Sequence, residues 1–79
     1  MFQNKNLSVL AMVGGADWTE WVYRDPYLDV AEMEKVGFFN QVKSIMNTGD
    51  LIILVGKDTV KQKYVFIHQG ETILEELGK

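Results

Sequence analysis

Three apolar segments of the chain have the length and the boundaries of β-strands. Residues 7–13 form an apolar run that ends in two glycines, residues 18–24 place alternate side chains on two faces, and residues 51–55 are five consecutive aliphatic residues. A short apolar run between turn residues is typical of a strand buried on both faces. We therefore expect residues 7–13 and 51–55 to be buried strands, with residues 51–55 at the centre of the sheet.

The second half of the chain predicts a hairpin that begins with residues 51–55. Residues 62–68 return after a turn with a strict alternation of side chains, which is the period of a strand. The two expected faces are Lys63, Val65 and Ile67 on one side and Tyr64, Phe66 and His68 on the other. Residues 72–77 fit either a last short strand or an amphipathic helix, because their apolar spacing permits both.

Residues 29–36 have the pattern of a short helix. Asp29 and Glu32 have the spacing of a capping box, and Val30 and Met33 lie three residues apart, on one helical face. A segment of about two turns is marginal by itself. The same residues therefore also fit an irregular excursion that is anchored by the two apolar side chains.

A second helix is predicted for residues 40–46. Gly37 separates it from the first, Phe38 and Phe39 provide a buried anchor, and Asn40 can cap the helix. Its expected apolar face consists of Val42, Ile45 and Met46.

Gly49 and Asp50 form the expected turn into the central strand, since glycine is the common residue just past a helix end. The predicted fold class is α+β and mostly β: a small antiparallel sheet or barrel with one or two short inserted helices. We expect a polar N-terminal arm at residues 1–6, either frayed or docked on a neighbour, and a single small domain at residues 7–79.

The size of the chain favours association with other chains. A domain of 79 residues buries only about 60% of its unfolded surface, so its core is marginal. The sequence contains no cysteine, which removes disulfides as a means of stabilisation. Burial between copies of the chain is the means that remains.

Charge and residue content argue against several classes of function. A net charge of −3 and scattered basic residues disfavour nucleic acid as the main partner, and no apolar stretch is long enough for a membrane span. Ser8 and Ser44 have no base beside them in sequence, and His68 is the only imidazole. We expect no enzyme activity, no catalytic residue, no cofactor and no metal site, and the role of His68 stays open.

Aromatic residues gather in one part of the chain. Trp18, Trp21, Tyr23 and Tyr27 fall within ten residues, which is more than a small core easily hides. Three interpretations remain open: packing in the core, contact with another protein, or a stacking platform for sugars or bases. With Phe38 and Phe39 these are the candidate core or interface anchors.

The order of several short motifs resembles a family of small proteins from the structural gene clusters of tailed phages and prophages. In that family an apolar strand precedes Trp-x-Tyr, an acidic stretch, Gly-Tyr-Phe-Asn, a short helix and Gly-Asp-hydrophobic-Ile. The corresponding residues are Trp21 and Tyr23, then Gly37 to Asn40 with Phe38 in place of the tyrosine, and Gly49 to Ile52. The resemblance covers most of residues 7–55.

The resemblance implies a non-catalytic structural protein of the virion, made in the cytoplasm of the bacterial host. The most specific implied role is capsid decoration or cementing, by a homo-oligomer such as a trimer that binds the major capsid protein or another virion protein. A head fibre or a tail attachment is a further possibility within the same class. A different class, a small SH3-like barrel that binds peptide or nucleic acid, is the alternative, since Gly-Asp entering a strand is also familiar there.

Overall fold

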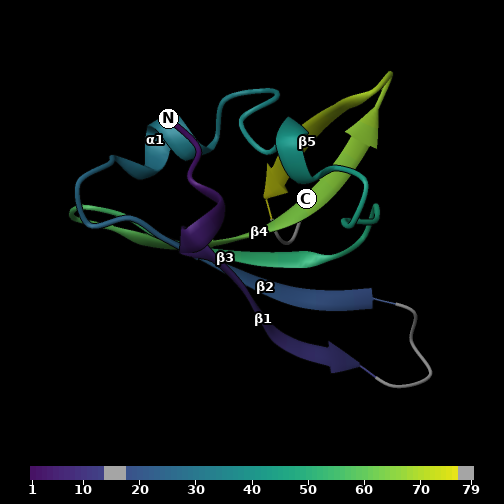
Figure 1. Cartoon of the computed structure of the whole chain (residues 1–79), viewed down its shortest axis with the longest axis horizontal. Helices are drawn as coiled ribbons and strands as arrows, with labels where there is room; N and C mark the ends of the chain where they lie inside the picture. Colours follow the sequence, from purple (N-terminus) through teal and green to yellow (C-terminus); the bar gives the residue numbers. More distant parts are fainter. Residues whose placement is uncertain (14–17, 77–79) are drawn as a thin grey trace.

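The computed structural model describes residues 1–13 and 18–76, with residues 11–13 described by their backbone alone, and its main element is one five-stranded sheet. The strands lie in the sheet in the order of the sequence (Figure 1). They are β1 (Leu7–Val13), β2 (Trp18–Arg24), β3 (Leu51–Val55), β4 (Val60–His68) and β5 (Glu71–Glu76). The predicted α+β, mostly β class is confirmed, and residues 71–76 are a strand rather than a helix.

One pair of neighbouring strands is parallel. β2 and β3 run in the same direction with Glu20 opposite Leu51, whereas the other three pairs are antiparallel. A parallel pair needs a long crossover connection. Here residues 25–50 supply it, with one short α-helix, α1 (Val30–Met33), and one 3-10 turn, η2 (Asn40–Val42). The prediction of a mostly antiparallel sheet is confirmed, but the sequence analysis did not predict the parallel pair.

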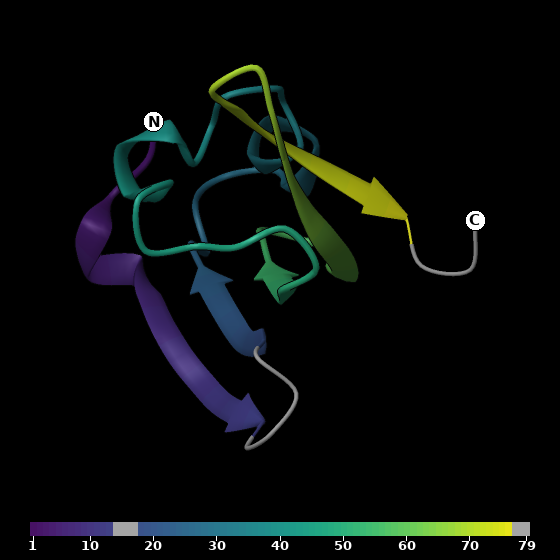
Figure 2. The ribbon, with the colours of Figure 1, turned by 90° about the vertical axis from the view of Figure 1, so that its right-hand side faces the viewer.

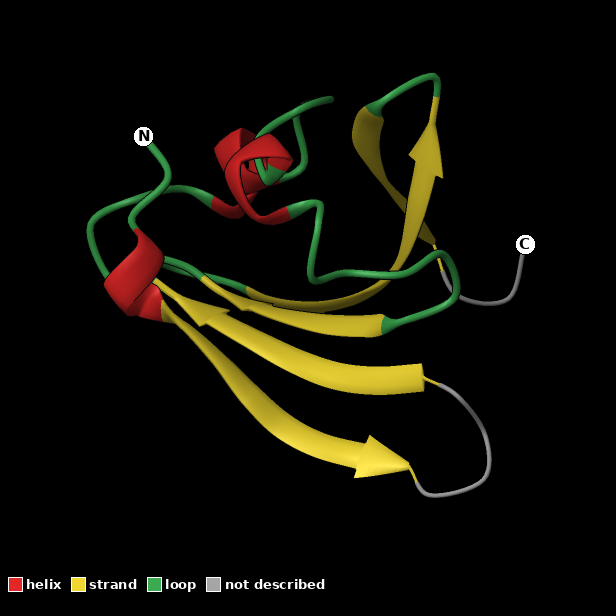
Figure 3. Cartoon of the chain, turned by 45° about the vertical axis from the view of Figure 1, so that its right-hand side comes forward, coloured by secondary structure: helices red, strands yellow, loops and turns green. Residues whose placement is uncertain are grey.

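The crossover covers only one side of the sheet. Figure 3 shows α1, η2 and their loops on one side, and no described element lies against the other. The sheet curls around the crossover, so that β4 and β5 close over it (Figure 2). The core lies in this concave side, and its most completely buried apolar side chains are Tyr23, Met33, Phe39, Ile52, Leu54 and Val65. We call this side the core face and the opposite side the outer face.

β1 is an edge strand. The prediction that residues 7–13 form a strand buried on both faces is therefore wrong. Val9 and Leu10 are each more than half exposed, at 51% and 55%, and the register slips between Val9 and Ala11. β1 has a strand on one side only, and the crossover passes over β2 to β5 rather than over β1. The central position of β3 is confirmed, but Leu51, Ile53 and Val55 on its outer face are only half-buried.

Both predicted helices are shorter than their patterns suggested. The first is a single turn in which Val30 and Met33 are buried as expected, but the Asp29 side chain makes no capping hydrogen bond. The second is only the η2 turn, and Ile45 is 55% exposed while Val42 and Met46 are buried. Short amphipathic segments are marginal as helices, so contacts with the sheet decide their course.

The N-terminal arm packs on the core of its own chain. Phe2 is 8% exposed, and its ring stacks on Tyr23 at a centroid distance of 5.3 Å. The backbone N–H of Gln3 donates a hydrogen bond to the hydroxyl oxygen of Tyr23 at 2.9 Å. The 3-10 turn η1 (Asn4–Asn6) then leads into β1. Phe2 thus anchors the arm on the core of its own chain, whereas Met1, Gln3, Asn4 and Lys5 are exposed.

We expect Phe2→Ala to lower the free energy of unfolding by about 3 kcal/mol, because it removes a buried ring from a close-packed cluster. Urea denaturation followed by circular dichroism measures the change. Met1→Ala is the matched control, since Met1 is 91% exposed and its loss should change stability by less than about 0.5 kcal/mol. If the two variants unfolded at the same urea concentration, the arm would not be part of the core.

Candidate interaction face of the sheet

The predicted aromatic anchors divide between the core and the surface. Tyr23, Phe38 and Phe39 meet Phe2 in one cluster, with ring centroids 5.0 to 5.8 Å apart. Trp21 is also buried, at 6% exposure. These four predicted anchors therefore pack within the chain.

The other two predicted anchors lie at the surface. Trp18 is half-buried on the outer face, and Tyr27 is 90% exposed in the turn after β2. Phe38 in the aromatic cluster is also only half-buried, so Tyr27 is the one predicted anchor that is largely exposed.

Asp50 is the polar centre of the core. It is fully buried, and its side chain accepts three hydrogen bonds: from the backbone N–H of Thr19 at 3.0 Å, the indole N–H of Trp21 at 2.9 Å and the backbone N–H of Asn47 at 3.0 Å. The first two donors belong to β2 and the third to the crossover. Both carboxylate oxygens therefore have hydrogen-bond partners, and Asp50 joins the two parallel strands at the point where β3 begins.

The other predicted turn residues hold the crossover to the sheet. Gly37 and Gly49 have positive φ values of 84° and 100°, which favour glycine. The N–H of Gly37 donates to the carbonyl of Thr72 at 2.8 Å, and the N–H of Gly49 donates to the carbonyl of Val65 at 2.8 Å. Asn40 does not cap a helix, because its side-chain oxygen accepts the backbone N–H of Thr72 instead.

Asp50→Ala should lower the free energy of unfolding by about 3 kcal/mol or more, because three N–H groups lose their acceptor inside the core. Asp50→Asn keeps the size and one acceptor oxygen, so its loss should be smaller. Urea denaturation of the two variants and of the wild type measures both values. A pair of variants as stable as the wild type would contradict the assigned role.

The outer face of the sheet is apolar and open. Tyr64 and Phe66 in β4 are each 39% exposed there, and Val60 in the same strand is 64% exposed. The cross-strand register shows which side chains share this face. Half-buried members on the neighbouring strands are Trp18, Val22, Leu51, Ile53, Val55 and Ile73. His68 also lies here, with its ring stacked on Phe66 at 5.7 Å.

A hollow of about 260 Å³ lies at one end of this outer face. Its lining residues are Trp18, Gly49, Leu51 and Tyr64. β3 begins only at Leu51, so the turn at Gly49 leaves a space between the ends of β2 and β4. A Cβ atom at Gly49 would have no atom within 4 Å, which agrees with open space above that residue. Among the described residues, two aromatic rings therefore flank this depression.

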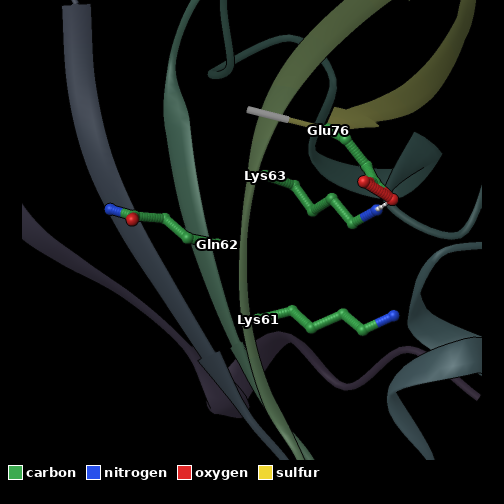
Figure 4. A pocket seen from close by; sticks show the side chains of 4 residues that line it. All are labelled: Lys61, Gln62, Lys63 and Glu76. Carbon is green, nitrogen blue, oxygen red and sulfur yellow. Dashed lines mark ion pairs between the residues drawn. The ribbon is translucent and has the colours of Figure 1, made fainter. Parts of the chain in front are cut away.

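A buried lysine makes a second, charged feature on the core face. Lys63 in β4 is 7% exposed and forms an ion pair with Glu34 at 2.9 Å, at the end of α1. Figure 4 shows Lys61 and Lys63 extending to the same side with Glu76, while Gln62 points away. A hollow of about 220 Å³ lies among these four labelled side chains. The acids neutralise the two lysines, so the group ties α1 to β4 and does not form a free basic site.

Two opposing effects act on the pKa of Glu34. Burial alone raises it, but the contacts and positive charges of Lys63 and Lys61 outweigh burial and hold the pKa below its ordinary value of 4.5. A carboxyl group with a lowered pKa stabilises the fold above its unfolded pKa, and this contribution disappears as the pH falls through the folded value.

Glu34→Gln should therefore be less stable than the wild type at neutral pH, because the buried Lys63 loses its closest counter-charge and keeps only the longer ion pair with Glu76, at 3.8 Å. The difference should shrink as the pH falls below about 4.5, when the wild-type group takes up a proton. Thermal unfolding at a series of pH values tests this. Glu32→Gln is the matched control, since Glu32 contacts only Lys35 in an exposed pair. A Glu34 difference that is constant with pH would contradict the assignment.

Among residues 1–13 and 18–76 no group of three or more His, Cys, Asp or Glu side chains could hold a metal ion. In the same part of the chain no helix has the length and apolar character to cross a membrane.

Comparison of the chain with protein-family models, with curated proteins and with solved structures finds no match in any of the three. The class that the structure itself shows is a small, mostly β protein with one mixed five-stranded sheet and a core on one side of it. The particular role has to be argued from the surfaces of the molecule.

Some structural residues could have been found from the sequence and others could not. The Trp-x-Tyr and Gly-Asp motifs were identified from the sequence. The hydrogen bond between Trp21 and Asp50 that joins them was not, because it depends on the parallel pairing of β2 with β3. Phe2 carries a signal, since it is a large apolar side chain in a polar arm. Lys63 carries a weaker signal, since the alternation places it on the face of Val65 and Ile67 although a lysine is ordinarily solvated.

Proposed function

We propose that this protein is a non-catalytic structural protein that assembles with other protein chains through the outer face of its sheet. The observation that carries the proposal is that Tyr64 and Phe66 are each 39% exposed on the outer face, which no described element covers. Contiguous exposed apolar surface on a small domain typically marks a site of protein association.

The composition of the outer face supports a protein partner. Aromatic side chains supply most of the binding energy at protein interfaces, and the face presents Trp18, Tyr64 and Phe66 together. Val22 and Ile53 are cross-strand partners at its centre, with the polar Ser8 and Gln62 on either side of them. Its charged side chains Glu20, Arg24 and Glu75 lie above and below this row. An apolar centre with charges at its margin is the common arrangement of an interface.

The setting that we propose is the virion of a tailed phage. The support is the resemblance in Trp21, Tyr23, Gly37 to Asn40, and Gly49 with Asp50 to small virion-associated proteins. In this role the chain forms a homo-oligomer, such as a trimer, that decorates or cements the capsid by binding the major capsid protein. A structural role of this kind needs no catalytic group and no cofactor.

Phe66→Asp should weaken self-association by about 30-fold or more, since it places a charge where an aromatic contact is lost, a change of about 2 kcal/mol. Sedimentation velocity over a concentration series measures the effect. Ile45→Asp is the matched control, because Ile45 is a comparably exposed apolar residue of the crossover, at 55%. A wild-type chain that stays monomeric at all concentrations, or equal weakening by both variants, would refute the proposed use of the outer face.

A further inference from the structure

Tyr27 is the most exposed aromatic residue whose surroundings the structure describes, and the chain holds it out on a braced turn. Its ring is 90% exposed. Its backbone N–H donates to a side-chain oxygen of Asp25 at 3.0 Å, and the N–H of Leu28 donates to the Asp25 carbonyl at 3.3 Å. Asp25 itself is buried and donates its N–H to the carbonyl of Val55 at 2.9 Å. The backbone that presents the ring is therefore fixed before any contact forms.

A fixed exposed aromatic ring is suited to binding. Ordering a mobile loop costs free energy at the moment of association, and a preorganised turn avoids that cost. Tyrosine adds a large contact area with only two side-chain torsions to restrain. Tyr27 thus has the properties of a projecting anchor residue, and no residue in the described part of the chain covers it.

The hollow at the other end of β2 is of suitable size and lining for such a ring. It measures about 260 Å³, and Trp18 and Tyr64 flank it. A cavity of about 150 Å³ is enough to hold a benzene molecule. The open space above Gly49 lets a ring approach the backbone closely. An aromatic ring placed there would find two ring partners, which favour stacked or edge-to-face contact.

Charges at the two ends of the outer face are complementary. Glu20 and Glu75 stand beside the hollow, since they are the cross-strand partners of Leu51 and Tyr64. Arg24 ends β2 three residues before Tyr27, on the same outer face. An approach that brings Tyr27 to the hollow of a second copy also brings Arg24 towards Glu20 and Glu75. Such pairs set orientation and partner choice more than affinity.

We propose that Tyr27 of one copy of this chain inserts into the hollow formed by Trp18, Gly49, Leu51 and Tyr64 of a second copy. The inference rests on the proposed function and specifies its self-contact. The projecting ring and the hollow lie at opposite ends of β2, about 20 Å apart for a strand of seven residues. The contact is therefore heterologous, and repetition head to tail closes into a ring when the rotation between copies allows it.

The decisive experiment mixes two variants that are each defective in one half of the contact. Tyr27→Ala removes the projecting ring and keeps the hollow, and Tyr64→Glu places a charge at the hollow and keeps Tyr27. Each variant alone should self-associate at least about 30-fold more weakly than the wild type. An equimolar mixture should form a heterodimer, because one intact contact remains between the two. Sedimentation velocity measures all three samples, with Tyr27→Phe as a control that retains association.

A second pair of variants tests the same contact without touching the hollow. Arg24→Glu alone and Glu20→Lys alone should each weaken self-association, and the double variant should recover it, since the charges are then exchanged between the two ends. Circular dichroism confirms that each variant is folded. Arg24 is exposed, so its substitution leaves the core unchanged.

The outcomes separate this inference from the proposed function. If Tyr27→Ala associates as tightly as the wild type while Phe66→Asp does not, the insertion of Tyr27 is wrong and the outer face still mediates assembly. If the mixture of Tyr27→Ala and Tyr64→Glu stays monomeric while the wild type associates, the heterologous geometry is wrong. A wild type that is monomeric throughout overturns the proposed function together with this inference.

Discussion

The hydrogen bonds of the Asp50 side chain hold the rest of the structure in register. A parallel pair of strands cannot be closed by a tight turn, so β2 and β3 depend on contacts made across the long crossover. Asp50 accepts N–H groups from Thr19 and Trp21 in β2 and from Asn47 in the crossover. These bonds place Leu51 opposite Glu20 and so set the faces on which every later side chain of the sheet lies.

The one-sided core follows from this topology. The crossover and the N-terminal arm both pack on the core face, where Tyr23 meets Phe2, Phe38 and Phe39. No described segment remains for the outer face, although β3 brings aliphatic side chains to both of its sides. A small domain that leaves one side of an apolar sheet uncovered gains stability when another chain covers it. Our proposals for assembly and for the Tyr27 contact both develop this single feature.

A buried ion pair also helps to hold the crossover against the sheet. Lys63 would be costly to bury alone, and its ion pair with Glu34 makes the burial possible. The pair links the end of α1 to the middle of β4, so it fixes the crossover at a second point distant from Asp50. Complementary charges on the outer face are arranged differently, with acids beside the hollow and Arg24 at the other end of β2.

The amino-acid sequence alone determined the strands β1 to β4, the central place of β3 and the alternation of β4, because short apolar runs and a period of two are local properties. The tertiary structure decided the parallel pair, the strand at residues 71–76, the short helical turns and the exposure of β1. It also joined Trp21 to Asp50, buried Phe2 and Lys63, and left Tyr27 exposed. Each of these depends on contacts between residues far apart in the chain, which a local pattern does not contain.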